Sequence, residues 1–144
     1  MEAKFVIDGE PKGKGRPRFN RYTGHAVTPR ETANYEAVVR FEYASQCKGI
    51  RFSDDAMLDM RITSYYAVAK SDSRKKREAK LNGALRPTKK PDCDNVVKII
   101  ADSLNGVAYR DDTQIVDCQV RKFFSEKPRV VVRIKEINNT NREE

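Results

Sequence analysis

The sequence predicts a single-domain α/β sandwich in which helices cover one face of a mixed, largely antiparallel sheet. Its length of 144 residues suits one domain with a real hydrophobic core. Segments with alternating apolar residues are separated by segments with apolar residues at helical spacing, in the order strand, helix, strand, basic segment, helix, strand, strand. No internal repeat or linker divides the chain, so we expect one domain over residues 1–144, with a frayed tail at residues 138–144.

The first predicted elements are a short strand and a long helix. Alternation of apolar and solvent-tolerant residues predicts a strand over Lys4–Asp8. Thr28 is in position to cap a helix that Pro29 begins, and Glu31 would complete a capping box. Apolar residues at helical spacing extend this helix to about Gln46, and they are Tyr35, Val38, Val39 and Tyr43.

The middle of the chain predicts a second strand and a second helix. Period-two alternation over Ala56–Val68 indicates a half-buried strand with an inner face made of Leu58, Met60, Ile62, Tyr66 and Val68. Asp94 is suited to cap the following helix, and Asn105-Gly106 ends it. The apolar stripe of this helix consists of Val96, Val97, Ile100 and Leu104, and its opposite face carries Asp94, Lys98 and Asp102 at steps of four.

The last third of the chain predicts two strands joined by a turn. Thr113–Phe124 alternates, and its inner face would be Val116, Cys118, Val120 and Phe124. Glu126-Lys127-Pro128 has turn composition. We therefore expect Arg129–Ile137 to form a hairpin with the preceding strand.

The composition favours nucleic acid as the partner. The formal net charge is +8 and the pI is about 9.5, and clustered Lys and Arg release counterions from phosphates. Simple binding proteins share such a charge, so it does not by itself indicate an enzyme. Three widely spaced cysteines argue against a disulfide framework or a zinc site. No apolar run reaches the ~20 residues of a membrane span, and the first residues lack the apolar centre of a signal peptide, so we expect a cytoplasmic protein without membrane contact.

Two basic segments are the predicted phosphate contacts. The segment from Pro11 to Arg30 contains six basic residues and no acidic residue. The glycines and prolines at its start indicate a flexible basic loop. The stretch Lys70–Lys90 holds nine basic residues and two acids, and its part Ser71–Leu81 is either disordered until DNA binds or a solvated helix. The predicted contacts are Lys12, Lys14, Arg16, Arg18, Arg74, Lys75, Lys76, Arg77, Lys89 and Lys90.

An acidic segment, Asp92–Asp117, stands out in this basic chain because it contains six aspartates against two basic residues. Converging aspartates suit Mg²⁺, which prefers carboxylate and water oxygens. Asp92, Asp94 and Asp112 are the candidate ligands, and Lys98 could neutralise charge that develops on a phosphate. Each residue also has a plain structural interpretation as a helix cap, a turn residue or a solvated ion pair. Their combination in a basic protein favours a metal site.

These residues also carry a family resemblance. Gly9-x-Pro11 with Lys14-x-Arg16-Pro17-Arg18, then Lys90-Pro91-Asp92-x-Asp94-Asn95-x-x-Lys98, Asp102-x-Leu104-Asn105-Gly106 and Asp111-Asp112-x-Gln114-Ile115, resemble the RusA-type Holliday-junction resolvases of phages and prophages. The resemblance covers nearly the whole chain.

The resemblance implies a homodimeric, Mg²⁺-dependent endonuclease, with Mn²⁺ as a possible substitute and no organic cofactor. Its implied role is to make paired, symmetric nicks in four-way DNA junctions during recombination and repair. Asp92, Asp94 and Asp112 are implied as the essential carboxylates and Lys98 as the essential lysine. Whether Asp111 or Asp112 is the third ligand stays open, and strand parity favours Asp112.

Three functions remain to be separated. A junction-resolving nuclease explains why the acidic segment and the basic segments occur together, and a two-fold dimer presents two sites for two symmetric cuts. A non-catalytic DNA-binding domain would not need the four residues of the candidate site. A nuclease acting on forks or flaps would use the same chemistry with looser substrate choice.

Overall fold

The protein is described here by a computed structural model that covers residues 1–15, 18–19, 21–27 and 29–138. Its main sheet has four strands in the order β1-β6-β4-β5. The strands are β1 (Glu2–Asp8), β4 (Leu58–Ala67), β5 (Ile115–Ser125) and β6 (Arg129–Glu136). β6 pairs antiparallel with both β1 and β4, whereas β5 pairs parallel with β4. The predicted fold class, a mixed and largely antiparallel sheet in one α/β domain, is confirmed.

The predicted hairpin between the last two strands is wrong. β4 lies between β5 and β6, so the turn after β5 carries the chain past the end of β4. In the register, Ala67 is opposite Ser125 of β5 and Tyr65 is opposite Arg129 of β6. A short turn between two strands favours a hairpin when only local sequence is considered. The apolar strand β4 instead takes the central position, where it is paired on both sides.

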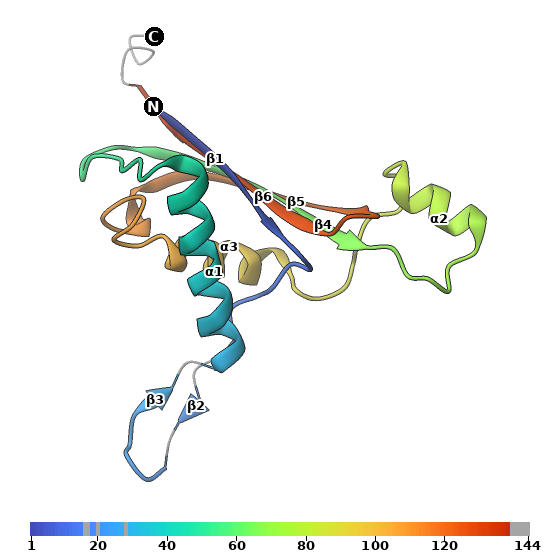
Figure 1. Cartoon of the computed structure of the whole chain (residues 1–144), viewed down its shortest axis with the longest axis horizontal. Helices are drawn as coiled ribbons and strands as arrows, with labels where there is room; N and C mark the ends of the chain where they lie inside the picture. Colours follow the sequence, from blue (N-terminus) through green and yellow to red (C-terminus); the bar gives the residue numbers. More distant parts are fainter. Residues whose placement is uncertain (16–17, 20, 28, 139–144) are drawn as a thin grey trace.

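Two helices pack on one face of the sheet, and this part of the prediction holds. They are α1 (Arg30–Cys47) and α3 (Cys93–Ser103), and both lie on the same side of the strands in Figure 1. The core between the layers includes buried apolar residues of β1, β4 and β6, such as Phe5, Met60, Ile62 and Val132, and partly buried residues of β5 pack against it. Burying each such side chain stabilises the fold by roughly 1.5–3 kcal/mol.

α1 begins one residue later than predicted. Pro29 is its N-cap and no side chain caps the first turn, so Glu31 does not complete the predicted capping box; Thr28 lies outside the described residues. Tyr35, Val39 and Tyr43 are buried as expected, but Val38 is 45% exposed. The buried stripe therefore follows steps of four and excludes Val38.

α1 also protects the outer edge of the sheet. The side-chain amide of Gln46 donates to the Val6 carbonyl at 2.8 Å and accepts from the Val6 N–H at 2.9 Å. The Tyr43 ring meets Phe5 edge-on at 5.4 Å between ring centroids. These contacts satisfy backbone groups of an edge strand that would otherwise be open to another chain.

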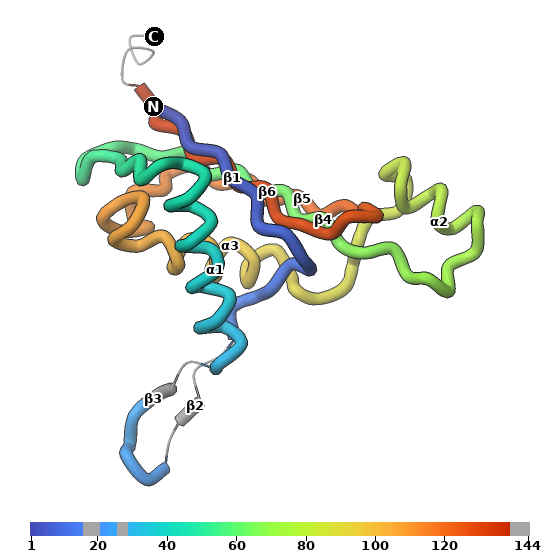
Figure 2. Tube along the Cα trace, viewed as in Figure 1, coloured from blue at the N-terminus to red at the C-terminus, as the bar shows by residue number. Residues whose placement is uncertain are grey.

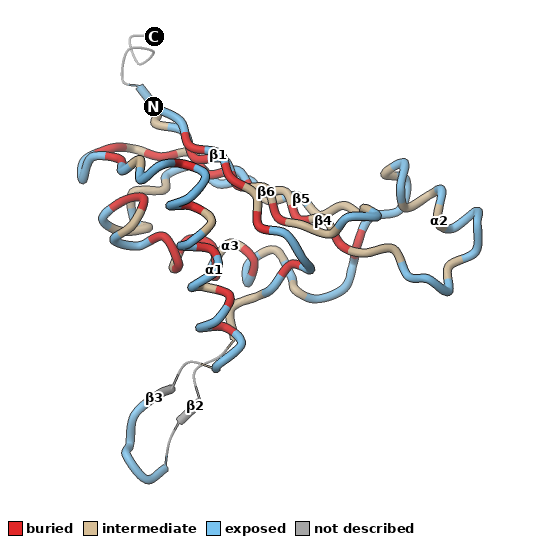
Figure 3. Tube along the Cα trace, in the orientation of Figure 1, coloured by how far each residue is buried: buried red, intermediate tan, exposed pale blue. Residues whose placement is uncertain are grey.

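The basic stretch forms a solvated helix, α2 (Arg74–Leu81), which is one of the two predicted states. Ser73 caps it by accepting from the Lys76 N–H at 3.2 Å, and it has no buried residues. Figure 3 shows α2 as exposed and intermediate chain beyond the end of the sheet. A two-stranded hairpin, β2 (Arg18–Phe19) and β3 (Ala26–Val27), extends from the opposite part of the molecule (Figure 1), and Figure 2 traces residues 21–25 at its tip, far from α2.

The predicted inner face of β5 is partly wrong. A bulge between Leu58 and Asp59 of β4 shifts the register, so that Ile115 is opposite Leu58 and Asp117 is opposite Asp59. Val116 falls in this irregularity and is 56% exposed. Cys118, also predicted on the inner face, is opposite the buried Met60 but is itself exposed, because β5 is an edge strand.

β4 follows its prediction closely. Leu58, Met60, Ile62 and Tyr66 are buried, but the strand ends at Ala67 and leaves Val68 outside it. Cys47, Cys93 and Cys118 are all free thiols. Within the described ranges, no helix is both long enough and apolar enough to span a membrane.

Candidate functional site

α3 carries three of the four predicted catalytic residues. Asp92 is its N-cap and accepts from the Asn95 N–H at 3.2 Å, so Asp92 takes the capping role that the sequence assigned to Asp94. Asp94 lies in the first turn, where the helix dipole favours a negative charge. Lys98 follows one turn later, with its side chain 62% exposed. The start of α3 therefore presents two carboxylates and, beside them, an accessible ammonium group.

Hydrogen bonds from two other parts of the chain fix the segment that leads into α3. The Tyr66 hydroxyl donates to the Pro91 carbonyl at 2.6 Å, and burial raises the pKa of this phenol to about 12. The described start of the basic loop, residues 9–15, lies against the same segment: the Lys14 N–H donates to the Asn95 carbonyl at 3.2 Å. A Cβ at Gly13 would lie 3.0 Å from side-chain atoms of both Asn95 and Pro91. Close backbone approach thus seats this loop beside the candidate site.

Lys14 points into the protein rather than away from it. Its Nζ lies 2.9 Å from Oε2 of Glu36 on α1 and 3.4 Å from Oδ2 of Asp102 on α3. Partial burial by itself lowers the pKa of Lys14, but hydrogen bonds to these two carboxylates and their charges outweigh it and raise the pKa. Lys14 therefore joins α1 to α3, and its predicted phosphate contact stays a prediction.

Asp102 connects two lysines to the fourth predicted residue. The same Oδ2 that contacts Lys14 lies 3.4 Å from Nζ of Lys98. Asp112, in the 3-10 turn η1 (Asp112–Gln114), makes a side-chain hydrogen-bonding contact with Asp102. Partial burial and this contact are the largest causes that raise the pKa of Asp112, and the charges of Asp102 and Asp111 act in the same direction.

Asp111 has a different environment. It caps η1 by accepting from the Thr113 N–H at 3.2 Å, and hydrogen bonds with Thr113 are the main cause that lowers its pKa. Gln114 completes this capping box and also donates to the carbonyls of Ser53 and Ala56 at 2.9 and 3.1 Å. The turn thus fixes Asp111 as a cap and leaves Asp112 beside Asp102.

The parity argument that favoured Asp112 has the wrong premise, because residue 112 is in a turn and the bulge interrupts the alternation. The contact of Asp112 with Asp102 is a different reason to prefer Asp112 over Asp111. A buried tyrosine supports this arrangement, since the Tyr109 hydroxyl donates to the Ala101 carbonyl at 2.7 Å and joins the segment before η1 to α3.

The candidate carboxylates fall into two pairs. Asp92 and Asp94 lie at the start of α3, and Asp102 and Asp112 lie at its end. Eight residues at 1.5 Å each separate Asp94 from Asp102 by about 12 Å along the helix. Among the residues that the structure describes, no three His, Cys, Asp or Glu side chains form a group that could hold a metal ion. Each pair still supplies the carboxylate oxygens that Mg²⁺ prefers, and Mg²⁺ is often held by one or two carboxylates plus substrate phosphates.

The residues predicted to contact phosphates differ in their position relative to the start of α3 and in whether they form ion pairs. Lys12, Lys89 and Lys90 are exposed and adjoin the segments that flank Asp92. On α2, Arg74, Lys76 and Arg77 each pair with an acid, whereas Lys75 forms no ion pair with any residue in the described ranges. Arg16 lies outside the described residues, and of Arg18 only the backbone in β2 is described.

Comparison with known proteins identifies the family. The family described as endodeoxyribonuclease RusA matches residues 8–135, which include every described residue of the candidate site. The chain belongs to the RusA family. It is therefore related to endodeoxyribonucleases that act on Holliday junctions. It is also similar to the uncharacterized protein YqaN of Bacillus subtilis (strain 168), with 37% identity over 137 residues that cover 94% of this chain and 96% of that protein.

The residue that sequence reasoning left out of the RusA-family site is Asp102. The spacing of Asp94, Lys98 and Asp102 at steps of four already placed them on one face of a helix. The spacing could not predict that Lys14 of the basic loop and Asp112 of η1 both lie beside Asp102. The contact with Lys14 joins segments that are far apart in the sequence, and the contact with Asp112 depends on the path of the turn that follows α3.

Proposed function

We propose that this protein is a Mg²⁺-dependent endonuclease that resolves four-way DNA junctions by paired, symmetric nicks, in recombination and repair. The observation that carries the proposal is one helix, α3, that presents Asp92, Asp94 and Lys98 in a basic RusA-family protein. A protein that only binds DNA has no use for carboxylates beside phosphates, because they repel the polyanion.

Asp92 and Asp94 would hold the ion at the start of α3, and Asp112 would contribute the third carboxylate. The bound ion supplies Lewis-acid chemistry, since it polarises a phosphodiester and lowers the pKa of an attacking water. Mn²⁺ offers the same preference for oxygen ligands and should substitute. Because Asp112 lies beside Asp102 in the single chain, its contribution to the same ion would depend on the assembled complex with DNA.

Lys98 would stabilise the negative charge that develops on the scissile phosphate. Its ammonium group is exposed, and its only ion pair within the described ranges is the contact with Asp102 at 3.4 Å. A positive group held beside developing charge lowers the barrier without having to reorganise during the reaction. Asp102 would orient this lysine.

The exposed lysines that flank α3 would position the DNA backbone over these groups. Lys12, Lys89 and Lys90 are not engaged in ion pairs with described residues. Lys89 and Lys90 precede Asp92 in the chain, and Lys12 belongs to the loop whose Lys14 N–H donates to the Asn95 carbonyl. Phosphate contacts of this kind fix the register of the substrate and carry no sequence information. Selectivity would then come from the shape of the junction.

The proposed assembly is a homodimer. Two cuts related by near two-fold symmetry need two equivalent sites, and a two-fold dimer provides them. A nuclease with looser preference for forks or flaps would use the same residues, so the substrate must be tested directly.

The variant Asp94→Asn tests the site. It removes one carboxylate and keeps the shape of the side chain, so cleavage of a four-way junction should be abolished. Junction binding should be unchanged or tighter, because a charge that repels phosphate is gone. Asp54→Asn is the matched control, since Asp54 is an exposed acid that pairs with Arg51 at 3.6 Å. Equal cutting by Asp94→Asn and Asp54→Asn would refute the assignment.

A further inference from the structure

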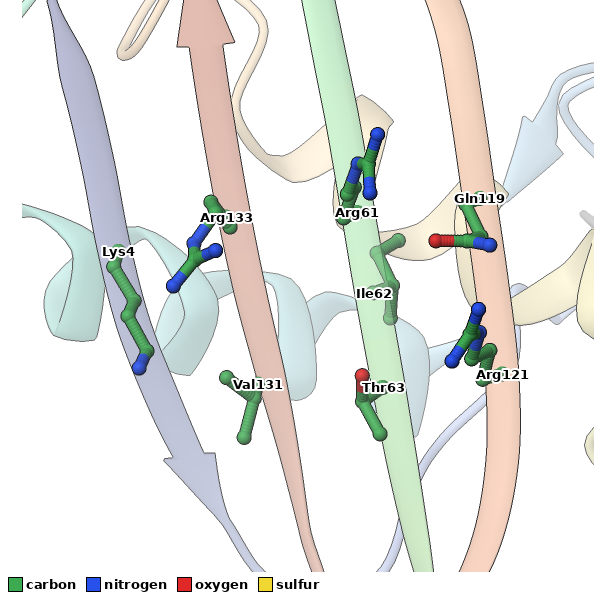
Figure 4. A pocket seen from close by; sticks show the side chains of 8 residues that line it. All are labelled: Lys4, Arg61, Ile62, Thr63, Gln119, Arg121, Val131 and Arg133. Carbon is green, nitrogen blue, oxygen red and sulfur yellow. The ribbon is translucent and has the colours of Figure 1, made fainter.

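The face of the sheet opposite α1 and α3 carries a band of basic side chains. The pairing registers place Lys4 of β1 opposite Arg133 of β6, and Arg133 opposite Arg61 of β4. These three residues therefore form one row across three adjacent strands. Neighbouring strands are about 4.8 Å apart, so the row spans roughly 10 Å. Figure 4 shows the three side chains standing on neighbouring strands.

The next positions along β4 and β5 continue this band. Gln119 of β5 is opposite Arg61, and Arg121 is opposite Thr63. Together with Val131 and Ile62 they line a hollow of about 280 Å³ on the sheet surface (Figure 4). Among the residues that the structure describes, no acid lines this hollow, and its lining has four basic residues and two neutral hydrogen-bonding side chains.

The acids of this face lie at its margin. Glu2 contacts Arg133 at 3.0 Å, and Asp59 contacts Arg61 at 3.3 Å. Both acids belong to the adjacent row, which runs from Glu2 of β1 through Lys135 and Asp59 to a third acid, Asp117 of β5. Lys4 and Arg121, in contrast, are exposed and form no ion pair with any residue that the structure describes. Two positive charges of the hollow are thus left without a partner in the described chain.

We propose that this face, defined by Lys4, Arg61, Arg121 and Arg133, binds the sugar-phosphate backbone of duplex DNA. The chemistry is complementary: arginine and lysine neutralise phosphates, and threonine and glutamine side chains donate to phosphate oxygens. A second copy of this chain is disfavoured, because facing the same surfaces would oppose like charges.

The inference rests on the proposed function in one respect, namely that the substrate is DNA. Three of the four candidate catalytic residues are at α3, which lies on the other side of the sheet (Figure 1), and the fourth, Asp112, lies beside Asp102 of α3. The basic face is therefore assigned to holding an arm of the substrate and not to chemistry. A four-way junction has arms that extend in several directions, so a protein that grips it can use surfaces on more than one side.

The double variant Lys4→Gln/Arg121→Gln tests this surface without touching the ion pairs of Arg61 and Arg133. Arg40→Gln/Lys48→Gln is the matched control: it also removes one arginine and one lysine, both exposed, on α1 and at its end. Binding of a fluorescent linear duplex and of a four-way junction is measured over a range of salt concentrations, without divalent metal. For the double variant the slope of log affinity against log salt should fall by roughly 2, since each phosphate contact contributes about 0.9. The control should keep the wild-type slope.

An unchanged slope for Lys4→Gln/Arg121→Gln, or an equal fall in both double variants, would overturn the inference. A wild-type protein that does not bind duplex DNA would also overturn it. So would a change from dimer to monomer in Lys4→Gln/Arg121→Gln, measured by light scattering, because the face would then be a subunit interface. Failure of the proposed nuclease activity is a separate result, since it would appear as absent cleavage with Mg²⁺ while binding and its salt slope stay as expected here.

Discussion

Nζ of Lys98 lies 3.4 Å from Oδ2 of Asp102, one turn further along α3, and Nζ of Lys14 lies at the same distance from the same oxygen. One carboxylate oxygen therefore joins the lysine of the candidate site to the basic loop. Asp102 also contacts the Asp112 carboxyl. This residue connects the two halves of the site, and its removal should affect cleavage without removing a proposed metal ligand.

Asp102→Asn should lower the rate of junction cleavage by about 10–100-fold, as is typical when a residue that orients a functional group is lost. The loss should be smaller than for Asp94→Asn, because Lys98 and the carboxylates at the start of α3 remain. The measurement is single-turnover cleavage at saturating protein, with binding in the absence of metal as a parallel readout. A wild-type rate for Asp102→Asn would show that the contact with Lys98 has no part in catalysis.

Lys14→Gln and Lys12→Gln should separate two roles within the basic loop. Lys14 is 19% exposed and bridges Glu36 and Asp102, so its loss leaves two carboxylates unpaired and should destabilise the fold by about 1–2 kcal/mol, less than for a fully buried pair. The melting temperature should fall by roughly 3–8 °C. Lys12→Gln should leave the melting temperature unchanged and weaken DNA binding. Equal melting temperatures for the two variants would contradict the bridging role of Lys14.

Asp112→Asn should stabilise the protein more at neutral pH than in acid. The folded pKa of Asp112 is raised above its ordinary value of 3.8. Its contribution to stability is therefore fully present below that value and is lost as the pH rises through the folded pKa. Asparagine does not ionise, so the gain in melting temperature over wild type should grow from about pH 4 to neutral pH. A gain that is constant with pH, or a loss at neutral pH, would show that partial burial and the neighbouring carboxylates do not disfavour ionised Asp112.

The helix α2 should tolerate the loss of Lys75 and respond to the loss of Arg77. Arg77 Nη2 lies 2.6 Å from Oε1 of Glu126 in the turn after β5, and this contact joins α2 to the sheet. Arg77→Gln should increase hydrogen exchange of the amides in α2, because the helix has no buried side chains to hold it. Lys75→Gln should leave exchange unchanged and lower the salt slope of DNA binding by about 1. If Lys75→Gln left the salt slope at its wild-type value, α2 would not be a phosphate contact through this residue.

The sequence predicted where the helices and strands lie and which of their faces are buried better than it predicted which strands pair with one another. Tyr35, Val39 and Tyr43 mark the buried stripe of α1, and Leu58, Met60 and Ile62 mark that of β4, because periodicity records which face of an element meets the core. Periodicity does not record which strand lies beside which. The parallel pairing of β4 with β5 joins residues almost 60 positions apart, and the local turn before Arg129 suggested a hairpin instead.

The same limit applies to the candidate site. Spacing alone placed Asp94, Lys98 and Asp102 on one face of α3, and the ion pair of Lys98 with Asp102 follows from it. The separation of Asp92 and Asp94 from Asp112 depends on where η1 lies. The Gln114 amide fixes η1 through the Ser53 carbonyl, 61 positions away, and the Tyr109 hydroxyl joins the segment before η1 to the Ala101 carbonyl of α3. A single bulge in the pairing of β4 with β5 was enough to invalidate the parity argument for Asp112.

The decisive measurement is cleavage of a synthetic four-way junction beside a linear duplex of the same arms, with Mg²⁺ and with EDTA. A Mg²⁺-dependent junction resolvase should make paired nicks in the junction only, and EDTA should prevent them. Asp94→Asn should be inactive on the same substrate. Tight junction binding without cutting, in Mg²⁺ and Mn²⁺ alike, would contradict the proposed activity and identify the protein as a DNA-binding member of its family.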